Sequence, residues 1–230
     1  MRVRRTFAFL DLSGFTAMTA TEGDERSVAV LGVFRTALRH TCSRRGVRIA
    51  KWLGDGAMLV GVETSPVVAA SLEMQCTPEI VGEPIAVKCG ITQGPVILLE
   101  GDDYIGHSVN VAARLCDLAR AGEVLADPAV VPAVPPWAVV EEQRSVELRG
   151  VEAPVAVVRL GIEQPGAGAS VDPICGITLS PSNAVASRSG AGAGTWLFCS
   201  DSCLDTWQSR PAVSGTAPPG AEAFVRDGIA

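Results

Sequence analysis

KWLGDG, at residues 51–56, separates two apolar runs, VRIA at 47–50 and AMLVGV at 57–62. A Gly-Asp-Gly sequence favours a tight turn, and apolar segments on both sides favour two paired strands. The stretch therefore predicts a β-hairpin with Lys51 and Asp55 near its tip. Taken alone, such an aspartate is usually a turn residue and such a lysine a solvated side chain. Their meaning depends on the rest of the chain.

The composition of the chain limits the classes of function in which this hairpin can take part. The chain has 230 residues, 47% of them hydrophobic, and a net charge of −6. This length and apolar content allow one full-sized domain plus a small one. An acidic chain is a poor candidate for binding nucleic acid or an anionic membrane, whereas a small ligand or a protein partner fits. No apolar run reaches the roughly 18–20 residues of a membrane span, and Asp11 interrupts the signal-like start, so we expect a cytoplasmic protein.

The flanking segments predict an α+β fold. One helix is expected over 24–46, with Val28, Leu31, Phe34, Ala37 and Leu38 on its buried side. Shorter helices are expected over 65–75 and 109–120, and strands over 7–12, 85–94, 95–101, 123–127, 138–150 and 154–160. This succession predicts helices covering a largely antiparallel sheet. We expect the first domain to span residues 1–163.

Three blocks together carry a family resemblance. FLDLSGFT at 9–16, KWLGDG at 51–56 and DYIGHSVNVAAR at 103–114 resemble, in order and separation, the signature blocks of class III nucleotidyl cyclases. The resemblance covers residues 6–160. It implies a ferredoxin-like sandwich that forms a head-to-tail homodimer, with active sites at the subunit interface. Since nothing precedes the first block, we expect no N-terminal receptor or sensor.

The resemblance assigns two metal ions per active site to Asp11, Asp55 and the backbone carbonyl of Leu12. Mg²⁺ and Mn²⁺ are hard cations that select such oxygen ligands. The loop that follows, with Gly14, Phe15 and Thr16, offers backbone amides suited to phosphates; these residues are candidates for substrate binding. The competing interpretation is a pair of ordinary strand-end aspartates.

Lys51 and Asp103 match the positions that read the base in adenylate cyclases. A lysine can donate to adenine N1 and a carboxylate can accept from the N6 amino group, whereas guanine reverses both requirements. The pair therefore favours ATP. Lys51 is one of only two lysines, the other being Lys88, in a strongly arginine-biased chain. Asp103 could instead be a turn residue, and a slip of one position would give its role to Asp102.

Asn110, Arg114 and Arg149 are the candidate catalytic residues. The resemblance implies that Asn110 orients the ribose and that Arg114 stabilises charge on the α-phosphate. The alternative for Arg114 is a surface ion pair with Asp117 or Glu123. Arg149 stands where many relatives carry a lysine that contacts the phosphates.

The sequence thus predicts an adenylate cyclase, a phosphorus-oxygen lyase that converts ATP to 3′,5′-cyclic AMP and pyrophosphate. One alternative is a catalytically silent cyclase-like protein that binds nucleotide and regulates a partner. Another is a metal-handling protein that uses the cyclase fold only to dimerise.

The C-terminal part has a different character. Residues 164–170 read as a flexible linker, and residues 171–211 resemble the YHS family, related to TRASH-type metal-binding modules, through DPICG and FCS-x-x-C. The Tyr-His-Ser signature itself is missing. Cys175, Cys199 and Cys203 form a candidate second metal site for Zn²⁺ or Cu⁺, with a fourth ligand from Asp201, Asp205, water or another chain. A vestigial small fold is the alternative. Residues 212–230 are expected to be disordered.

Overall fold

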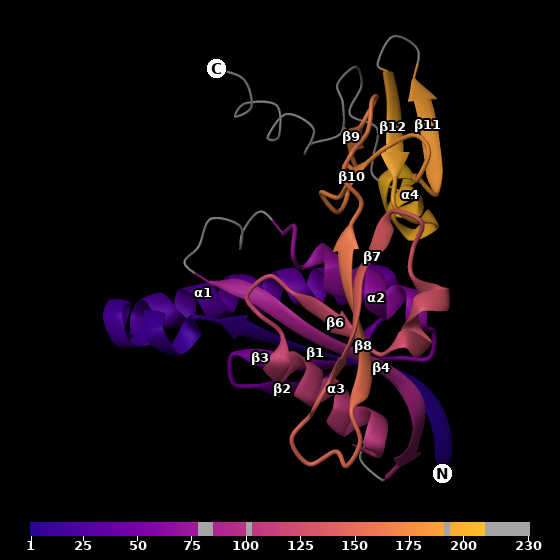
Figure 1. The fold of residues 1–230 in the computed structure, drawn as a ribbon. Coiled ribbons are helices and arrows are strands. Elements are labelled where there is room, and N and C mark those ends of the chain that lie inside the picture. Colours follow the sequence, from indigo (N-terminus) through magenta and orange to yellow (C-terminus); the bar gives the residue numbers. More distant parts are fainter. Residues whose placement is uncertain (78–84, 100–102, 191–193, 210–230) are drawn as a thin grey trace. The chain divides into compact units, whose positions relative to one another are not determined.

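The computed structural model describes residues 1–77, 85–99, 103–190 and 194–209. The chain divides into two compact units, Met1–Ile162 and Glu163–Ala230, which are described separately (Figure 1). Residues 212–230, for which we expected disorder, lie outside the described residues.

The first unit is built on one sheet with the strand order β2-β3-β1-β4-β6-β8-β7, and β5 pairs with β4. Every strand pair is antiparallel except β4 with β6. The predicted α+β fold with a largely antiparallel sheet is therefore confirmed. The strands are β1 (Arg2–Ser13), β2 (Arg48–Leu53), β3 (Gly56–Gly61), β4 (Ala86–Leu98), β5 (Tyr104–Ile105), β6 (Val124–Ala126), β7 (Ala138–Val146) and β8 (Val155–Ile162).

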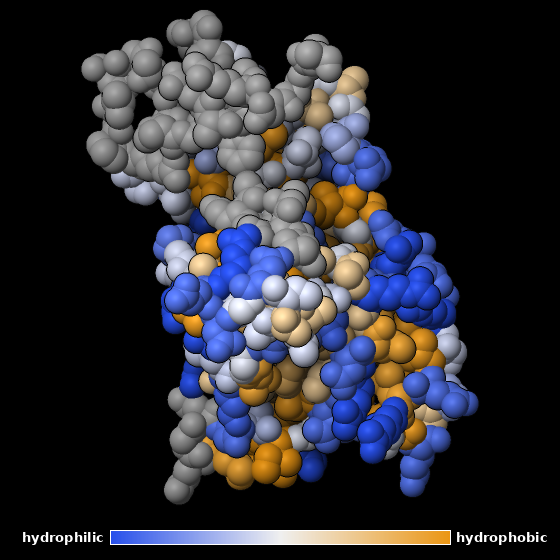
Figure 2. All heavy atoms as spheres, turned by 90° about the vertical axis from the view of Figure 1, so that its left-hand side faces the viewer, coloured by the Kyte–Doolittle hydropathy of each residue, from blue (hydrophilic) through white to orange (hydrophobic). Residues whose placement is uncertain are grey.

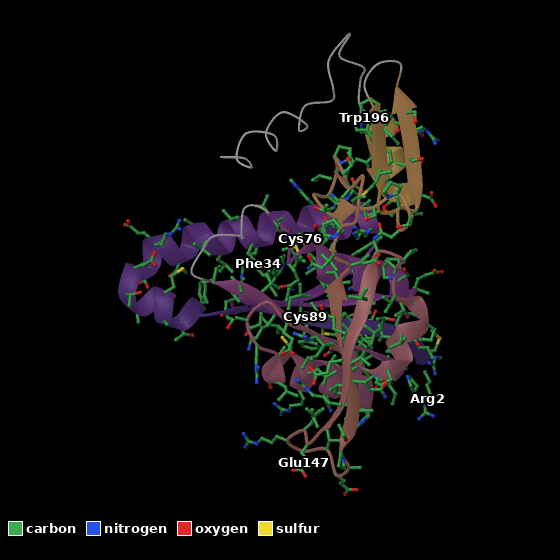
Figure 3. The ribbon with its side chains drawn as sticks, turned by 45° about the horizontal axis from the view of Figure 1, so that its top comes forward. Arg2, Phe34, Cys76, Cys89, Glu147 and Trp196 are labelled. Carbon is green, nitrogen blue, oxygen red and sulfur yellow. The ribbon has the colours of Figure 1, made fainter. Side chains whose placement is uncertain are left out.

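The helices are α1 (Phe15–Arg45), α2 (Thr64–Glu73) and α3 (His107–Leu118), with a 3-10 turn η1 (Pro128–Ala133). The first is longer than predicted and is interrupted at Gly23, whose φ of 85° is not helical. Its buried face was predicted only in part. Phe34 is fully buried on the side that faces the sheet (Figure 3), but Val28 is 69% exposed and Val30 is buried instead.

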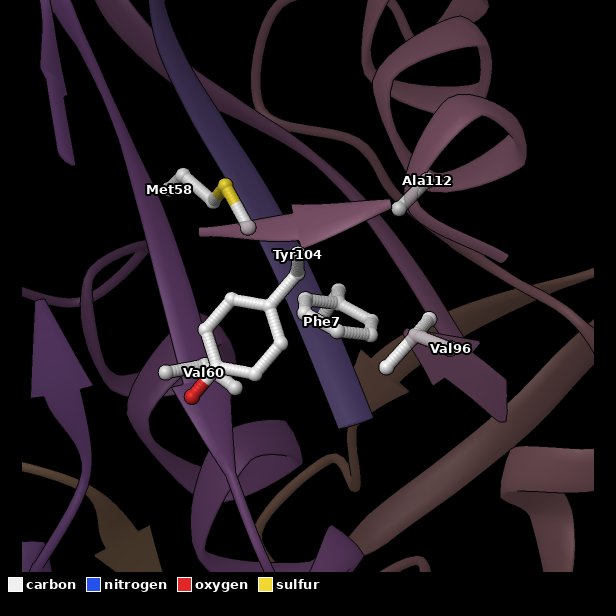
Figure 4. Packing of buried hydrophobic residues seen from close by; sticks show 6 residues of the cluster. All are labelled: Phe7, Met58, Val60, Val96, Tyr104 and Ala112. Carbon is white, nitrogen blue, oxygen red and sulfur yellow. The ribbon is translucent and has the colours of Figure 1, made fainter. Parts of the chain in front are cut away.

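A compact apolar cluster supports the strands that carry the site (Figure 4). Phe7 of β1 and Tyr104 of β5 meet edge to face, with ring centroids 5.3 Å apart. Such aromatic pairs add about 0.5–1.5 kcal/mol beyond their buried area. The contact anchors the segment that follows Asp103 to the central strand. The other buried members are Met58, Val60, Val96 and Ala112.

A buried carboxylate joins the C-terminal ends of α1 and α2. Glu73 is only 3% exposed, and it accepts hydrogen bonds from Thr41 (2.8 Å) and Arg45 (2.6 Å) and from Arg44. Its burial is compensated because the charge is paired and hydrogen-bonded. The network fixes α1 against α2.

The described residues of the second unit form two small antiparallel sheets and one helix. Its aromatic core brings Trp196 to 5.3 Å and Phe198 to 5.6 Å from the Trp207 ring, measured between centroids. In the segment we read as a linker, the backbone N–H of Gly166 donates to Ser180 Oγ at 2.7 Å. The elements are β9 (Ser170–Val171), β10 (Thr178–Leu179), β11 (Ala186–Gly190), β12 (Gly194–Phe198) and α4 (Asp201–Gln208).

Candidate functional site

Asp11 and Asp55 approach each other where the β2–β3 turn meets β1. Leu10 pairs with Ala57 across β1 and β3, which places Asp11 beside the turn that holds Asp55. Gly56 permits this approach, since a Cβ there would lie 2.5 Å from the Leu10 carbonyl oxygen and 3.2 Å from Asp11 Oδ1. The hairpin predicted from KWLGDG is present, with its turn at Gly54 and Asp55.

The electrostatics of this pair suit a divalent cation. Partial burial raises the pKa of Asp55, and the charge of Asp11 raises it further, whereas a backbone hydrogen bond and Lys88 act in the opposite direction. Two carboxylates that repel each other form an oxygen-rich donor set that a hard cation would stabilise. The side chains present, together with the neighbouring Leu12 carbonyl, therefore fit Mg²⁺ or Mn²⁺.

Lys88 belongs to this group, although sequence reasoning gave it no role. It lies directly opposite Asp11 across β1 and β4, and its Nζ is 3.1 Å from Asp11 Oδ2. Burial alone would lower the pKa of Lys88, but its hydrogen bond to Asp11 and the charge of Asp11 raise it overall. The only hint in the sequence was the rarity of lysine.

Lys51 and Asp103 form an ion pair with Nζ 2.8 Å from Oδ1, although 52 positions separate them. The hydrogen bond from Lys51 lowers the pKa of Asp103, as does the bond from the Tyr104 backbone N–H. Both side chains are 46% exposed. The structure thus brings the two predicted base-reading residues together at an accessible position.

The helix α1 starts directly after Asp11 and its neighbours. Gly14 adopts a left-handed conformation, with φ of 89°, at the N-cap, and Phe15 begins the helix. The first-turn amides of a helix have no intrahelical acceptor and favour anions. Gly14 and Thr16 are exposed and Phe15 is half-buried, so this terminus is accessible to a phosphate.

Asn110 and Arg114 lie on α3, and both are exposed. Arg114 Nη1 is 3.0 Å from Asp117 Oδ2, so the surface pair considered as its alternative role exists in the single chain. Among the described residues, neither side chain forms a hydrogen bond or ion pair with Asp11, Asp55, Lys51 or Asp103.

Arg149 is exposed in the loop between β7 and β8, next to the buried Leu148. Figure 3 marks this loop at Glu147. Within the described parts of the chain, Arg149 forms no hydrogen bond or ion pair with Asn110 or Arg114.

Two arginines of α1 contact the β2–β3 hairpin. Arg35 Nη2 donates to the Gly54 carbonyl oxygen at 3.0 Å. The guanidinium carbons of Arg35 and Arg39 lie 5.1 Å and 5.0 Å from the centroid of the Trp52 ring. Such cation–π contacts stabilise by about 0.5–1 kcal/mol when exposed. The turn that carries Asp55 is therefore attached to α1.

The three cysteines of the second unit converge as expected. Cys175 Sγ is 3.4 Å from Cys199 Sγ, which is 3.6 Å from Cys203 Sγ, and all three side chains are buried. Asp172, which sequence reasoning missed, joins them: one ligand atom from each of the four residues lies within 4.8 Å of the others.

Two of the expected sources of a fourth ligand, both aspartates of α4, need correction. Asp201 and Asp205 are exposed on α4 and are not members of the cluster, whereas Asp172 is 1% exposed. Its position three residues before Cys175, in DPICG, was the available signal.

Burial makes the charged forms in this cluster unfavourable. It raises the pKa of Asp172 to about 6, assisted by the negative charge of a Cys199 thiolate. Burial also raises the pKa of Cys175 well above its usual value. For Cys203 the hydrogen bond with Cys175 lowers the pKa, but the bond with Cys199 and burial outweigh it and raise the pKa to about 12. A cation would have to replace the thiol protons on binding.

Comparisons with known proteins identify the fold. The chain is 32% identical over 152 residues to the uncharacterized protein Rv2212 of Mycobacterium tuberculosis, covering 66% of this chain and 40% of the relative. It is 30% identical over 129 residues to an adenylate cyclase of Streptomyces coelicolor, covering 55% and 33%. The crystal structure of the guanylyl cyclase Cya2 matches with a TM-score of 0.63 and 24% identity, covering 73% of this chain and 96% of that one. No protein-family model matches the chain.

The first unit therefore has the fold of the class III adenylyl and guanylyl cyclase catalytic domains. Adenylate cyclases are also among the sequence relatives of the chain. The chain spans between one third and two fifths of the length of the two curated relatives described above. Within the described ranges, no helix combines the length and apolar character needed to cross a membrane.

Proposed function

We propose that this protein is an adenylate cyclase that converts ATP to 3′,5′-cyclic AMP and pyrophosphate. The observation that carries the proposal is the close pair of carboxylates, Asp11 and Asp55, on a cyclase fold. The two groups fit a pair of Mg²⁺ or Mn²⁺ ions, with the Leu12 carbonyl as a further ligand. When bound, such ions supply an activated 3′-oxygen and neutralise the triphosphate.

The residues around this pair would bind and orient the triphosphate. Lys88, which contacts Asp11 in the single chain, can donate to a phosphate oxygen, and the α1 terminus at Gly14, Phe15 and Thr16 offers amides. In the reaction the ribose 3′-hydroxyl loses its proton to water and its oxygen bonds to the α-phosphorus. The bond from that phosphorus to the bridging oxygen breaks, and pyrophosphate leaves.

The Lys51–Asp103 pair supports ATP as the substrate. The ammonium group can donate to adenine N1 while the carboxylate accepts from N6. Guanine would place a donor against the lysine and an acceptor against the aspartate. Groups left unpaired in this way discriminate strongly between substrates.

A head-to-tail homodimer would complete each site. Asn110, Arg114 and Arg149 are exposed in the single chain and would come from the second subunit, where they orient the ribose and stabilise the phosphate charge. Exposed apolar side chains beside Asp103 support such an interface: Ile97 and Ile105, which pair across β4 and β5, are 43% and 55% exposed. Figure 2 shows apolar patches between hydrophilic ones on one face.

A cytoplasmic location fits the proposed function, because ATP is the substrate and the seven free cysteines fit a reducing compartment.

Cyclic nucleotide formation tests this proposal. The purified chain would be given Mn²⁺ with ATP or with GTP, and the products separated by chromatography, with an Asp55→Asn variant as the control. We expect cyclic AMP in excess over cyclic GMP from the wild type, and neither from the variant. A dimeric wild-type protein that makes no cyclic product at any metal concentration would favour the catalytically silent alternative. A preference for GTP would refute the assigned base recognition.

The second unit supports a second function, the binding of a thiophilic metal ion through Cys175, Cys199 and Cys203. Their sulfur separations of 3.4 and 3.6 Å are close to the distance of about 3.8 Å between thiolates around a tetrahedral zinc ion with bonds of about 2.3 Å. They greatly exceed the roughly 2.05 Å of a disulfide. We expect the purified chain to retain Zn²⁺ or Cu⁺, and a Cys199→Ser, Cys203→Ser variant to lose it. Equal metal content in the two proteins would refute this function.

A further inference from the structure

Asp172 is buried beside the three thiols of the second unit. We propose that its carboxylate is the fourth ligand of this site, which then takes a borderline divalent cation of the Zn²⁺ class through three thiolates and one oxygen. The inference rests on the proposed metal binding by the cysteines and specifies both its ligand set and its ion.

The backbone holds Asp172 at this position. Its N–H donates to the Ile177 carbonyl oxygen at 2.8 Å, and its own carbonyl accepts from the Gly176 N–H at 2.9 Å. These two bonds close the DPICG turn, which also carries Cys175. The carboxylate and the first thiol therefore come from one rigid turn, and both are buried.

The carboxylate is oriented by hydrogen bonds from both cysteine-bearing segments. Oδ1 accepts from the Ile174 N–H at 2.8 Å and from the Cys175 N–H at 3.4 Å, while Oδ2 accepts from the Cys199 N–H at 2.8 Å. A carboxylate oxygen has two lone pairs, so a backbone bond to Oδ2 leaves it able to coordinate an ion. One carboxylate oxygen of Asp172 lies within 4.8 Å of each of the three sulfurs, close enough for all four atoms to surround one ion.

The mixed ligand set determines which ion fits. Zinc accepts thiolates and carboxylate oxygens in one tetrahedral site, with Zn–O distances of about 2.0–2.2 Å. Copper(I) is soft and is selected by thiolate and thioether sulfur, whereas Mg²⁺ and Ca²⁺ select oxygen. The sequence left the choice between Zn²⁺ and Cu⁺ open. Three sulfur ligands and one oxygen ligand favour Zn²⁺.

Asp201 and Asp205 provide matched controls. Both lie on α4 with Cys203, and both are exposed. Replacing them removes two carboxylates from the helix that carries Cys203, while the carboxylate of Asp172 stays in place. If loss of negative charge alone weakened zinc binding, these variants would bind zinc more weakly as well.

The experiment measures the coordination of Zn²⁺ and Co²⁺ in the full chain. Zinc X-ray absorption is expected to give three sulfurs and one oxygen in the wild type and in an Asp201→Asn, Asp205→Asn variant. An Asp172→Cys variant is expected to give four sulfurs and stronger sulfur-to-cobalt charge-transfer absorption. An Asp172→Ala variant should bind zinc at least about tenfold more weakly. A purely positioning role for Asp172 would weaken binding too, but it would not add a fourth sulfur.

The outcomes separate this inference from the function on which it rests. A wild-type chain that binds neither Zn²⁺ nor Co²⁺ would overturn metal binding by the cysteines altogether. Binding with four sulfurs in the wild type, or loss of the oxygen in the Asp201→Asn, Asp205→Asn variant, would overturn the role of Asp172 alone. So would an Asp172→Cys variant that stays at three sulfurs. Should that variant fail to fold, an Asp172→His variant replaces it: imidazole scattering is then expected in the zinc X-ray absorption spectrum, and its absence would overturn the role of Asp172.

Discussion

Lys51 on β2 and Asp103 before β5 form an ion pair, with 2.8 Å between Nζ and Oδ1, and both side chains are exposed to solvent. A Lys51→Glu, Asp103→Lys double variant keeps the pair but reverses its polarity. We expect kcat/KM for ATP to fall by about two orders of magnitude and the ratio of cyclic GMP to cyclic AMP to rise. Competition between ATP and GTP in one reaction measures this ratio.

The single Lys51→Glu variant is the control, since it sets two carboxylates against each other. It should lose ATP activity without gaining the full preference for GTP. An unchanged product ratio in the double variant would contradict base recognition by this pair.

Asn110 is exposed and forms no hydrogen bond with Asp11 among the described residues, which leads to a prediction about mixed dimers. An Asp11→Ala chain and an Asn110→Ala chain should each be nearly inactive. In a mixed dimer, one of the two composite sites keeps all its groups. Equal mixing should restore about a quarter of wild-type activity, because half of the dimers are mixed and each has one intact site.

Activity would be measured on mixtures whose heterodimer content is established with two affinity tags. Proven heterodimers without recovered activity would show that the two residues do not serve one shared site. The homodimer would then have to hold complete sites within each subunit.

Arg35 is expected to position the Asp55 turn. An Arg35→Gln variant weakens the bond to the Gly54 carbonyl and the contact with Trp52. Because a hydrogen bond of this kind contributes about 0.5–1.5 kcal/mol, the Mn²⁺ concentration for half-maximal activity should rise roughly three- to tenfold. An Arg39→Gln variant loses only its contact with Trp52 and should change far less. Equal shifts in both variants would argue against this role, and Arg35→Lys should restore part of the metal affinity.

Glu73 is expected to be critical for stability. Its removal in a Glu73→Ala variant leaves the positive charges of Arg44 and Arg45 without their buried partner. Breaking a buried pair in this way costs about 3–5 kcal/mol of the free energy of unfolding. Urea denaturation followed by circular dichroism measures the change. A Glu22→Ala variant removes an exposed pair with Arg26 and should cost less than about 1 kcal/mol; similar losses in both would contradict the assignment.

The sequence predicted the sheet-bound parts of the site because they lie within local patterns. KWLGDG and FLDLSGFT each combine a strand end with a turn, and pairing of β1 with β3 then brings Asp11 to Asp55. The role of Lys88 could not be predicted in this way, since its contact with Asp11 depends on the register between β1 and β4. Asp172 presents the same difficulty, because 27 positions separate it from Cys199.

The buried face of α1 shows a second limit. The hydrophobic pattern predicted that Val28 is buried, but this residue is exposed. The same pattern did not predict the burial of Ser27. Ser27 Oγ lies within hydrogen-bond distance of the Gly23 carbonyl oxygen (2.9 Å) and of Thr19 Oγ1 (2.8 Å), so its burial is compensated. The contact with Thr19, eight positions away, depends on the interruption at Gly23, which periodicity alone does not reveal.

Gly56 has no side chain to contribute, yet the spacing of the two carboxylates depends on it. A methyl group there would meet the main chain of β1, which, unlike a flexible side chain, cannot rotate away. Even alanine would push the hairpin outward and carry Asp55 with it. The distance between the two carboxylates is thus limited by how closely the hairpin backbone approaches the backbone of β1.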